Sequence, residues 1–190
     1  MLVISVIGYN RKIVMSINVI IITNSEFEEP EVIYPYYRLK SAGFNVDIAT
    51  INGYDVKGKW GYPISAMIKP NVPLDIFSLK SNNFDLVVIP GGLLPPDKLR
   101  QDKATLDFIV DMHSQNKIVA SICHGPWVLV SAGILKGVKA TCYPSMIDDL
   151  NNCGAKYIDS SVVIDKNIVT SRRPSDLPQF VDAIISLLIK

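Results

Sequence analysis

Short apolar runs alternate with amphipathic segments along most of this chain. Runs of this length, bounded by polar or turn residues, are typical of strands buried in a parallel sheet. They occupy residues 17–23, 44–50, 86–89, 118–122 and 138–141. Apolar residues at helical spacing predict helices between and after them, at 29–41, 102–115, 126–132, 145–152 and from 177 onward.

This alternation predicts a doubly wound α/β domain, with a mostly parallel sheet and helices on both faces. Two further apolar runs, 162–165 and 168–171, surround a Lys166-Asn167 turn and predict a hairpin. The segment 52–73 is rich in Gly, Pro and Lys and predicts turns and short edge structure. We expect one domain over residues 17–190, preceded by an N-terminal extension, residues 1–16, to which the sequence assigns no role.

Composition narrows the class of protein. The chain has 190 residues, of which 48% are hydrophobic and 19% charged, with a net charge of +1. Because no run of like charges appears, we expect no binding to nucleic acid or to a membrane. The apolar start precedes a basic pair instead of following one, so it does not predict a signal peptide. Three cysteines without metal-type spacing and two histidines predict no metal site and a cytoplasmic location.

The strongest candidate for chemistry is Cys123. It lies between the apolar run 118–122 and the helix that begins near Pro126. Small residues two positions before and after it, Ser121 and Gly125, allow the sharp strand-to-helix turn of a nucleophile elbow. The start of the following helix directs N–H groups at the sulfur, which favours the thiolate.

A thiolate that attacks a carbonyl needs donors for the developing oxyanion and a group that handles protons. The backbone N–H groups of Gly91, Gly92 and His124 are the candidate donors, since glycine lets the chain approach a ligand closely. Several glutamates follow the first strand, and one of them could point inward to handle the proton: Glu26, Glu28, Glu29 and Glu31. The pattern alone does not indicate which one.

From about residue 17 to 189 the chain resembles the PfpI-type intracellular proteases, in the superfamily of the Parkinson-associated deglycase. The motifs that carry this resemblance are Glu26-Phe27-Glu28-Glu29-Pro30-Glu31, Ile33-Tyr34-Pro35-Tyr36, Pro90-Gly91-Gly92, Ala120-Ser121-Ile122-Cys123-His124-Gly125-Pro126, Ser131-Ala132-Gly133, Tyr143-Pro144 and Val169-Thr170-Ser171-Arg172. The resemblance implies a flavodoxin-like sheet with the architecture of class I glutamine amidotransferases. An amidotransferase activity is not expected, because no histidine follows His124.

The resemblance also implies roles for individual residues. Cys123 matches the nucleophile, His124 the adjacent histidine, and Glu28 the glutamate that hydrogen-bonds the sulfur. We expect Glu28 and Cys123 to share one proton, because two neighbouring anions would repel each other. Asp97 resembles an acidic residue that reaches the histidine of a neighbouring subunit, which implies a homo-oligomer, either a dimer or a trimer of dimers.

Four residues are expected near the substrate pocket. Tyr143 and Lys59 match pocket residues of the family. Trp127 and Trp60 stand where the family commonly has other residues, and two indoles could narrow the pocket or add an apolar wall. They could equally be packing residues, since tryptophan is usually largely buried.

The expected activity is that of a cysteine-nucleophile enzyme, acting without a cofactor on a small carbonyl or peptide substrate. The resemblance covers peptidase and protein deglycase activities. One alternative is a glyoxalase that converts methylglyoxal to lactate. Another is a redox-sensing stress protein, in which Cys123 is oxidised to a sulfinate.

Overall fold

The computed structural model describes residues 16–68 and 73–189. Of the predicted extension, residues 1–16, all but Ser16 lie outside the described residues. Among the residues described, no helix is both long and apolar enough to cross a bilayer.

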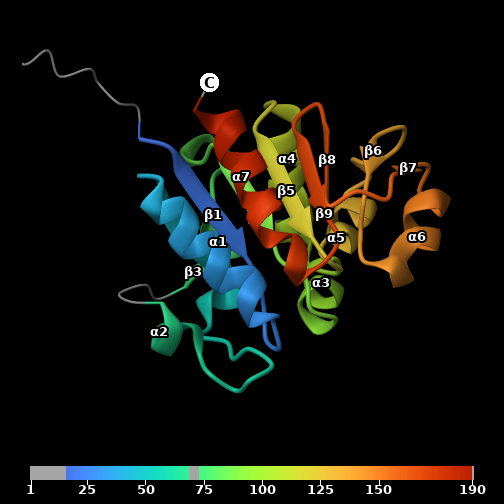
Figure 1. Ribbon diagram of the computed structural model, residues 1–190. Coiled ribbons are helices and arrows are strands. Elements are labelled where there is room, and N and C mark those ends of the chain that lie inside the picture. The colour runs from blue at the N-terminus through green and yellow to red at the C-terminus, as the bar shows by residue number, and fades with distance from the viewer. Residues whose placement is uncertain (1–15, 69–72, 190) are drawn as a thin grey trace, which may run out of the picture.

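A central sheet of seven strands organises the molecule (Figure 1). Its order is β3-β2-β1-β4-β5-β9-β8, and every neighbouring pair is parallel except β8 and β9. The strands span Asn18–Ile22 (β1), Asn45–Thr50 (β2), Leu74–Asp75 (β3), Leu86–Ile89 (β4), Ile118–Ile122 (β5), Val162–Asp165 (β8) and Ile168–Ser171 (β9). The predicted flavodoxin-like α/β architecture is therefore confirmed.

Side chains alternate between two apolar cores because successive residues of a strand point to opposite faces. Val19 and Ile21 belong to the core that the helices α1 (Glu29–Ser41) and α7 (Leu177–Leu188) cover. Ile20 and Ile22 belong to the other core, under α4 (Lys103–Ser114) and α5 (Pro126–Ser131). Both faces are thus buried, which explains why the strands read as continuous apolar runs.

The predicted helices are present, and α1 continues through Pro35 although proline usually breaks a helix interior. Short elements were not predicted. They are α2 (Ile64–Met67), α3 (Leu94–Leu99), β3, β7 (Lys156–Tyr157) and the 3-10 turns Ile51–Gly53, Ile76–Ser78, Ser81–Asn83, Pro144–Met146 and Pro174–Asp176.

The predicted strand at 138–141 is present only as β6 (Lys139–Ala140), and it does not join the central sheet. It pairs in parallel with β7 in a separate two-stranded sheet. With α6 (Ile147–Asn152) this small sheet lies at the edge of the molecule beyond β8 (Figure 1). The segment after β6 then returns toward the carboxyl end of β5, where the candidate site lies.

Candidate active site

Cys123 lies in a strained turn directly after β5. Its φ is +62°, a left-handed conformation that a residue with a side chain rarely adopts. Its N–H donates to Ser171 O at 3.1 Å, which ties the turn to β9. A Cβ on Gly125 would lie 2.4 Å from both Ile89 O and Ser121 Oγ. The backbone therefore has the close approach that the predicted nucleophile elbow requires, and Cys123 as a residue is only 6% exposed.

The carboxyl that meets this thiol belongs to Glu31, which corrects the expectation for Glu28. Glu31 is fully buried, accepts the Gly91 N–H at 2.6 Å through Oε2, and lies beside the Cys123 side chain, with which it interacts across Gly91. Glu28 instead places its Oε2 2.8 Å from Lys59 Nζ, in a partly exposed ion pair. The physical reason is helix geometry, because Glu28 is the N-cap residue of α1 whereas Glu31 lies on the buried face of its first turn.

Glu31 and Cys123 are buried next to each other, so the protonation of one affects the pKa of the other. Burial raises the pKa of Glu31 to about 7, although the Gly91 bond acts in the opposite direction. Burial also raises the pKa of the Cys123 thiol, as does the charge of an ionised Glu31. Hydrogen bonds from the Gly92 and His124 backbones lower the Cys123 pKa. One negative charge shared between Glu31 and Cys123 is therefore the favoured state near neutral pH.

The donors for an oxyanion differ in part from those expected. The Gly91 N–H is occupied by Glu31, so Gly91 does not serve as a donor. A Cβ on Gly91 would lie 2.6 Å from Cys123 Cβ, so glycine is needed there for close packing. The Gly92 and His124 backbones interact with the sulfur, and Gly92 has a φ of +80°, which glycine adopts without strain. Gly92 and His124 are thus the two available donors.

Both ring nitrogens of His124 have a polar partner. Its Nδ1 lies 3.3 Å from Cys123 Sγ, and its Nε2 lies 3.1 Å from Ser145 Oγ. The Tyr143 ring stacks on it at a centroid distance of 4.7 Å. Burial, followed by the charge of Lys59, lowers the pKa of His124 below its ordinary value. A neutral imidazole next to the sulfur is therefore favoured.

A cavity of about 470 Å³ opens over the thiol. It is lined by Glu28, Lys59, Gly92, Leu93, Cys123, His124, Tyr143, Ser145 and Pro174. The expected pocket residues Lys59 and Tyr143 lie in its wall. Leu93, which directly follows Gly92, was not singled out. Ser145 and Pro174 were not predicted, because they come from loops whose course depends on tertiary contacts.

The two tryptophans and Asp97 are not among the residues that line this cavity. Trp127 packs on His124 at 5.2 Å between ring centroids, and its indole N–H donates to Asp149 at 2.9 Å. It therefore supports the histidine and does not form the pocket wall that was expected. Trp60 is 63% exposed in a separate groove on the outer side of α1. Asp97 lies on α3, where its carboxylate accepts from Gln101 Nε2 at 3.3 Å.

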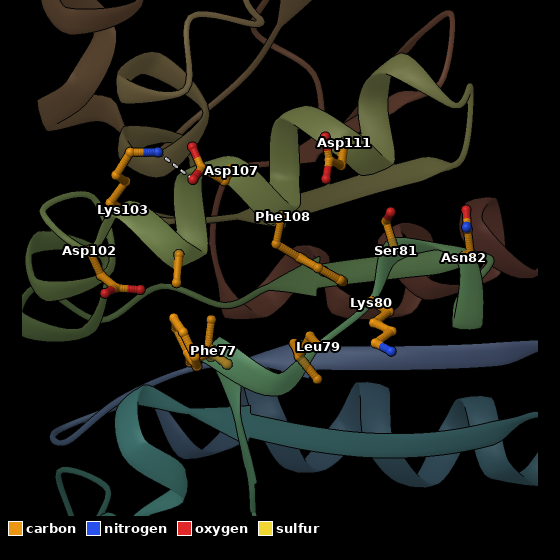
Figure 2. Close-up of a pocket in the computed structure, with 12 residues that line it drawn as sticks. Phe77, Leu79, Lys80, Ser81, Asn82, Asp102, Lys103, Asp107, Phe108 and Asp111 are labelled. Carbon is orange, nitrogen blue, oxygen red and sulfur yellow. Dashed lines mark hydrogen bonds and ion pairs between the residues drawn. The ribbon is translucent and has the colours of Figure 1, made fainter.

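A second and larger cavity, of about 660 Å³, lies between the segment 76–82 and α4. Figure 2 shows Phe77 and Leu79 on one side of it and the acidic residues of α4 on the other. Its polar groups are largely engaged, since Asp107 pairs with Lys103 and Asp102 accepts the Thr105 N–H. No cysteine or histidine is among the residues that line this cavity. The described residues hold no cluster of potential metal ligands either.

Comparison with known proteins decides the family. The DJ-1/PfpI family pattern matches residues 17–187. The chain belongs to the DJ-1/PfpI family. This confirms the predicted resemblance, and the matched span includes Cys123, His124 and Glu31.

Individual relatives of this DJ-1/PfpI protein carry enzyme names. "Deglycase PH1704" of Pyrococcus horikoshii is 41% identical over 170 residues, covering 90% of this chain and 98% of the relative. "Putative cysteine protease YraA" of Bacillus subtilis is 37% identical over 175 residues, covering 92% and 99%. The crystal structure of Drosophila melanogaster DJ-1beta superposes with a TM-score of 0.83 at 32% identity, covering 92% of this chain and 91% of that chain.

Proposed function

We propose that this protein is a cysteine enzyme that attacks carbonyl groups without a cofactor, as a hydrolase of the deglycase or peptidase type. The observation that carries the proposal is the Cys123–Glu31 pair, buried at the base of a cavity beside the Gly92 and His124 donors. The names of the relatives, deglycase and putative cysteine protease, support the same class of reaction.

The first step moves one proton and forms one bond. The Cys123 thiol gives its proton to the Glu31 carboxylate, and the resulting thiolate attacks the substrate carbonyl carbon. The carbonyl oxygen becomes an oxyanion, which the N–H groups of Gly92 and His124 stabilise. The pKa of Glu31, raised to about 7 by burial, suits a group that takes and returns a proton near neutral pH.

With an acylated amine or a peptide, the tetrahedral adduct expels the amine, which takes the proton held by Glu31. This leaves a thioester on Cys123 and a Glu31 carboxylate. Glu31 then removes a proton from water, the hydroxide attacks the thioester, and the acid leaves as the proton returns to sulfur. The cavity of about 470 Å³ admits small substrates or a short peptide segment.

A glyoxalase activity is the second candidate, and the position of Glu31 favours it. With a 2-oxoaldehyde such as methylglyoxal, Cys123 forms a hemithioacetal, whose alkoxide takes the proton from Glu31. The Glu31 carboxylate then moves a proton from C1 to C2 through an enediol, which gives a thioester of lactate. Water hydrolyses this thioester to lactate and the free thiol. The sequence is an isomerisation followed by hydrolysis, so it consumes no oxidant.

A homo-oligomer is proposed as the working form, as the family resemblance implies. Whether Asp97 of one subunit reaches His124 of another stays a prediction. Within the chain, Nε2 of His124 is already bonded to Ser145.

Turnover of methylglyoxal by the wild type, Cys123→Ala and Cys153→Ala tests the proposal. Lactate formed, methylglyoxal lost, and amine released from glycated and peptide substrates are all measured. We expect many turnovers per subunit, at least about a hundredfold loss in Cys123→Ala, and nearly full activity in Cys153→Ala, whose thiol bonds Leu150 O away from the cavity. Substrate loss that saturates near one molecule per Cys123, with no product, would overturn the proposal and favour the redox-sensing alternative.

A further inference from the structure

The proposed reaction assigns no role to the contact between His124 and Ser145. Ser145 lies in the 3-10 turn Pro144–Met146, and its Oγ is 3.1 Å from His124 Nε2. This turn is fixed to the elbow, because the Tyr143 N–H donates to Cys123 O at 2.9 Å. The Met146 N–H in turn donates to Tyr143 O at 2.9 Å. The hydroxyl is therefore carried by a turn whose backbone is hydrogen-bonded to the residue that bears the nucleophile.

The number of protons on the imidazole ring sets the direction of the two hydrogen bonds that His124 makes. A neutral imidazole has one N–H and one lone pair on its two nitrogens. A thiolate can only accept, so the nitrogen that faces Cys123 Sγ, Nδ1, must carry the proton when the sulfur is ionised. Nε2 is then an acceptor, and the Ser145 hydroxyl is the group placed to donate to it.

We propose that Ser145 is the positioning residue for His124, donating its hydroxyl to Nε2 and so holding the Nδ1–H on the Cys123 thiolate. The proposal rests on the proposed function only for its effect on turnover, since the hydrogen bond itself is independent of any substrate. His124 stabilises the thiolate in this arrangement, and Glu31 takes the proton.

This arrangement competes with the one that the family resemblance implies for Asp97. A ring nitrogen makes one hydrogen bond in the ring plane, so a carboxylate from a neighbouring subunit would have to displace Ser145. A carboxylate would also require the opposite tautomer, because it accepts and Nε2 would have to donate. The protonated nitrogen of His124 therefore distinguishes the two arrangements.

Nitrogen NMR of the imidazole rings in the full-length protein reads this tautomer directly. The chain has two histidines, so a His113→Gln variant assigns both sets of signals. The variants to compare are Ser145→Ala, Ser145→Thr and Asp97→Ala. Ser186→Ala is the matched control, since it removes an exposed hydroxyl that bonds Asp182 O on α7. Activity on methylglyoxal is measured in parallel.

In the state in which Glu31 holds the shared proton and the sulfur is ionised, we expect the wild type to hold its His124 proton on Nδ1, and Ser145→Ala to shift it toward a mixture of both tautomers. Ser145→Ala should lower kcat about three- to tenfold with little change in KM, the effect of one hydrogen bond, while Ser145→Thr restores both readouts. Asp97→Ala and Ser186→Ala should leave the tautomer unchanged. A wild-type proton on Nε2, or a tautomer that moves in Asp97→Ala and not in Ser145→Ala, would overturn the proposal. If methylglyoxal and the other carbonyl substrates are not turned over, the proposed function fails while the NMR result still decides the role of Ser145.

Discussion

At the scale of single residues, Glu31 is the group whose chemistry depends most on its surroundings. It is fully buried, and the positive charge of Lys59 acts on it only as the smallest of the influences on its pKa. Removing a carboxylate from water favours its neutral form, and this is why the pKa of Glu31 rises to about 7. With a pKa of about 7, Glu31 can both accept the proton of the Cys123 thiol and return it.

This pKa predicts how the stability of the protein changes with pH. In the unfolded chain the Glu31 carboxyl has its ordinary pKa of 4.5, so it loses its proton at a lower pH than it does in the folded protein. Protonation of Glu31 therefore favours the folded state, and the free energy of unfolding falls as the pH rises from about 4.5 to about 7. The loss amounts to about 3 kcal/mol.

A Glu31→Gln variant, which cannot ionise, should escape this loss. We expect its Tm to exceed that of the wild type by about 6 to 12 °C above pH 7 and to show no gain near pH 4.5. Thermal unfolding followed by circular dichroism at both pH values measures the difference. An equal difference at the two pH values would show that Glu31 does not titrate as described.

Glu31 also shows what the sequence could and could not predict at this scale. The elbow around Cys123 was predictable, because it depends on local residue types and spacing. The choice among four glutamates was not made correctly, and helical periodicity could not have corrected it. Glu28 has the same spacing to the buried Val32, Pro35 and Leu39 that a residue of their stripe would have, so a projection favours it at least as much as Glu31. The deciding fact is that the helix begins only at Glu29, which leaves Glu28 as an extended N-cap residue.

At the scale of elements, the site depends on how β5 turns into α5. The turn is compressed because Gly125 lies against β4 and β5, and even a methyl group there would meet Ile89 O and Ser121 Oγ. Overpacking of this kind displaces backbone, and a shift of about 1 Å at a reacting atom can cost about a hundredfold in rate.

We therefore expect Gly125→Ala to lower the kcat/KM for methylglyoxal by about a hundredfold and to lower the free energy of unfolding by about 2 kcal/mol. Gly133→Ala, at the end of α5, is the matched control. It has open space around its Cβ and a φ of +73°, so it should lose only about 1 kcal/mol of stability and keep its activity. Equal activity in the two variants, measured with urea titrations alongside, would contradict the role given to the compressed turn.

The elements themselves were predictable where apolar periodicity is strong, as in β1, β4, β5, α4 and α7. Short elements were not predicted, because too few residues define them. α3 contains Pro95 and Pro96 and follows a glycine turn, so its sequence has the composition of a loop. The strand at 138–141 was expected in the central sheet, but only its pairing with β7, a tertiary contact, determines where it lies.

At the scale of the whole molecule, the sheet order brings three segments together at the carboxyl ends of its central strands. β1, β4 and β5 are neighbours. Glu31 follows β1, Gly92 follows β4, and Cys123 follows β5. A doubly wound sheet places ligand chemistry at this edge, so the general location of the site was predictable from the fold class. The lining residues from more distant loops, Ser145 and Pro174, were not.

The most direct test of the account compares methylglyoxal turnover in Glu31→Gln and Glu28→Gln, since both glutamates lie near Cys123 and only one contacts the sulfur. Loss of the proton carrier should lower kcat in Glu31→Gln by at least about a hundredfold. Glu28→Gln, which removes a partly exposed ion pair with Lys59, should keep kcat within about threefold of the wild type. A large loss in Glu28→Gln with retained turnover in Glu31→Gln would contradict the Cys123–Glu31 pair as the catalytic unit.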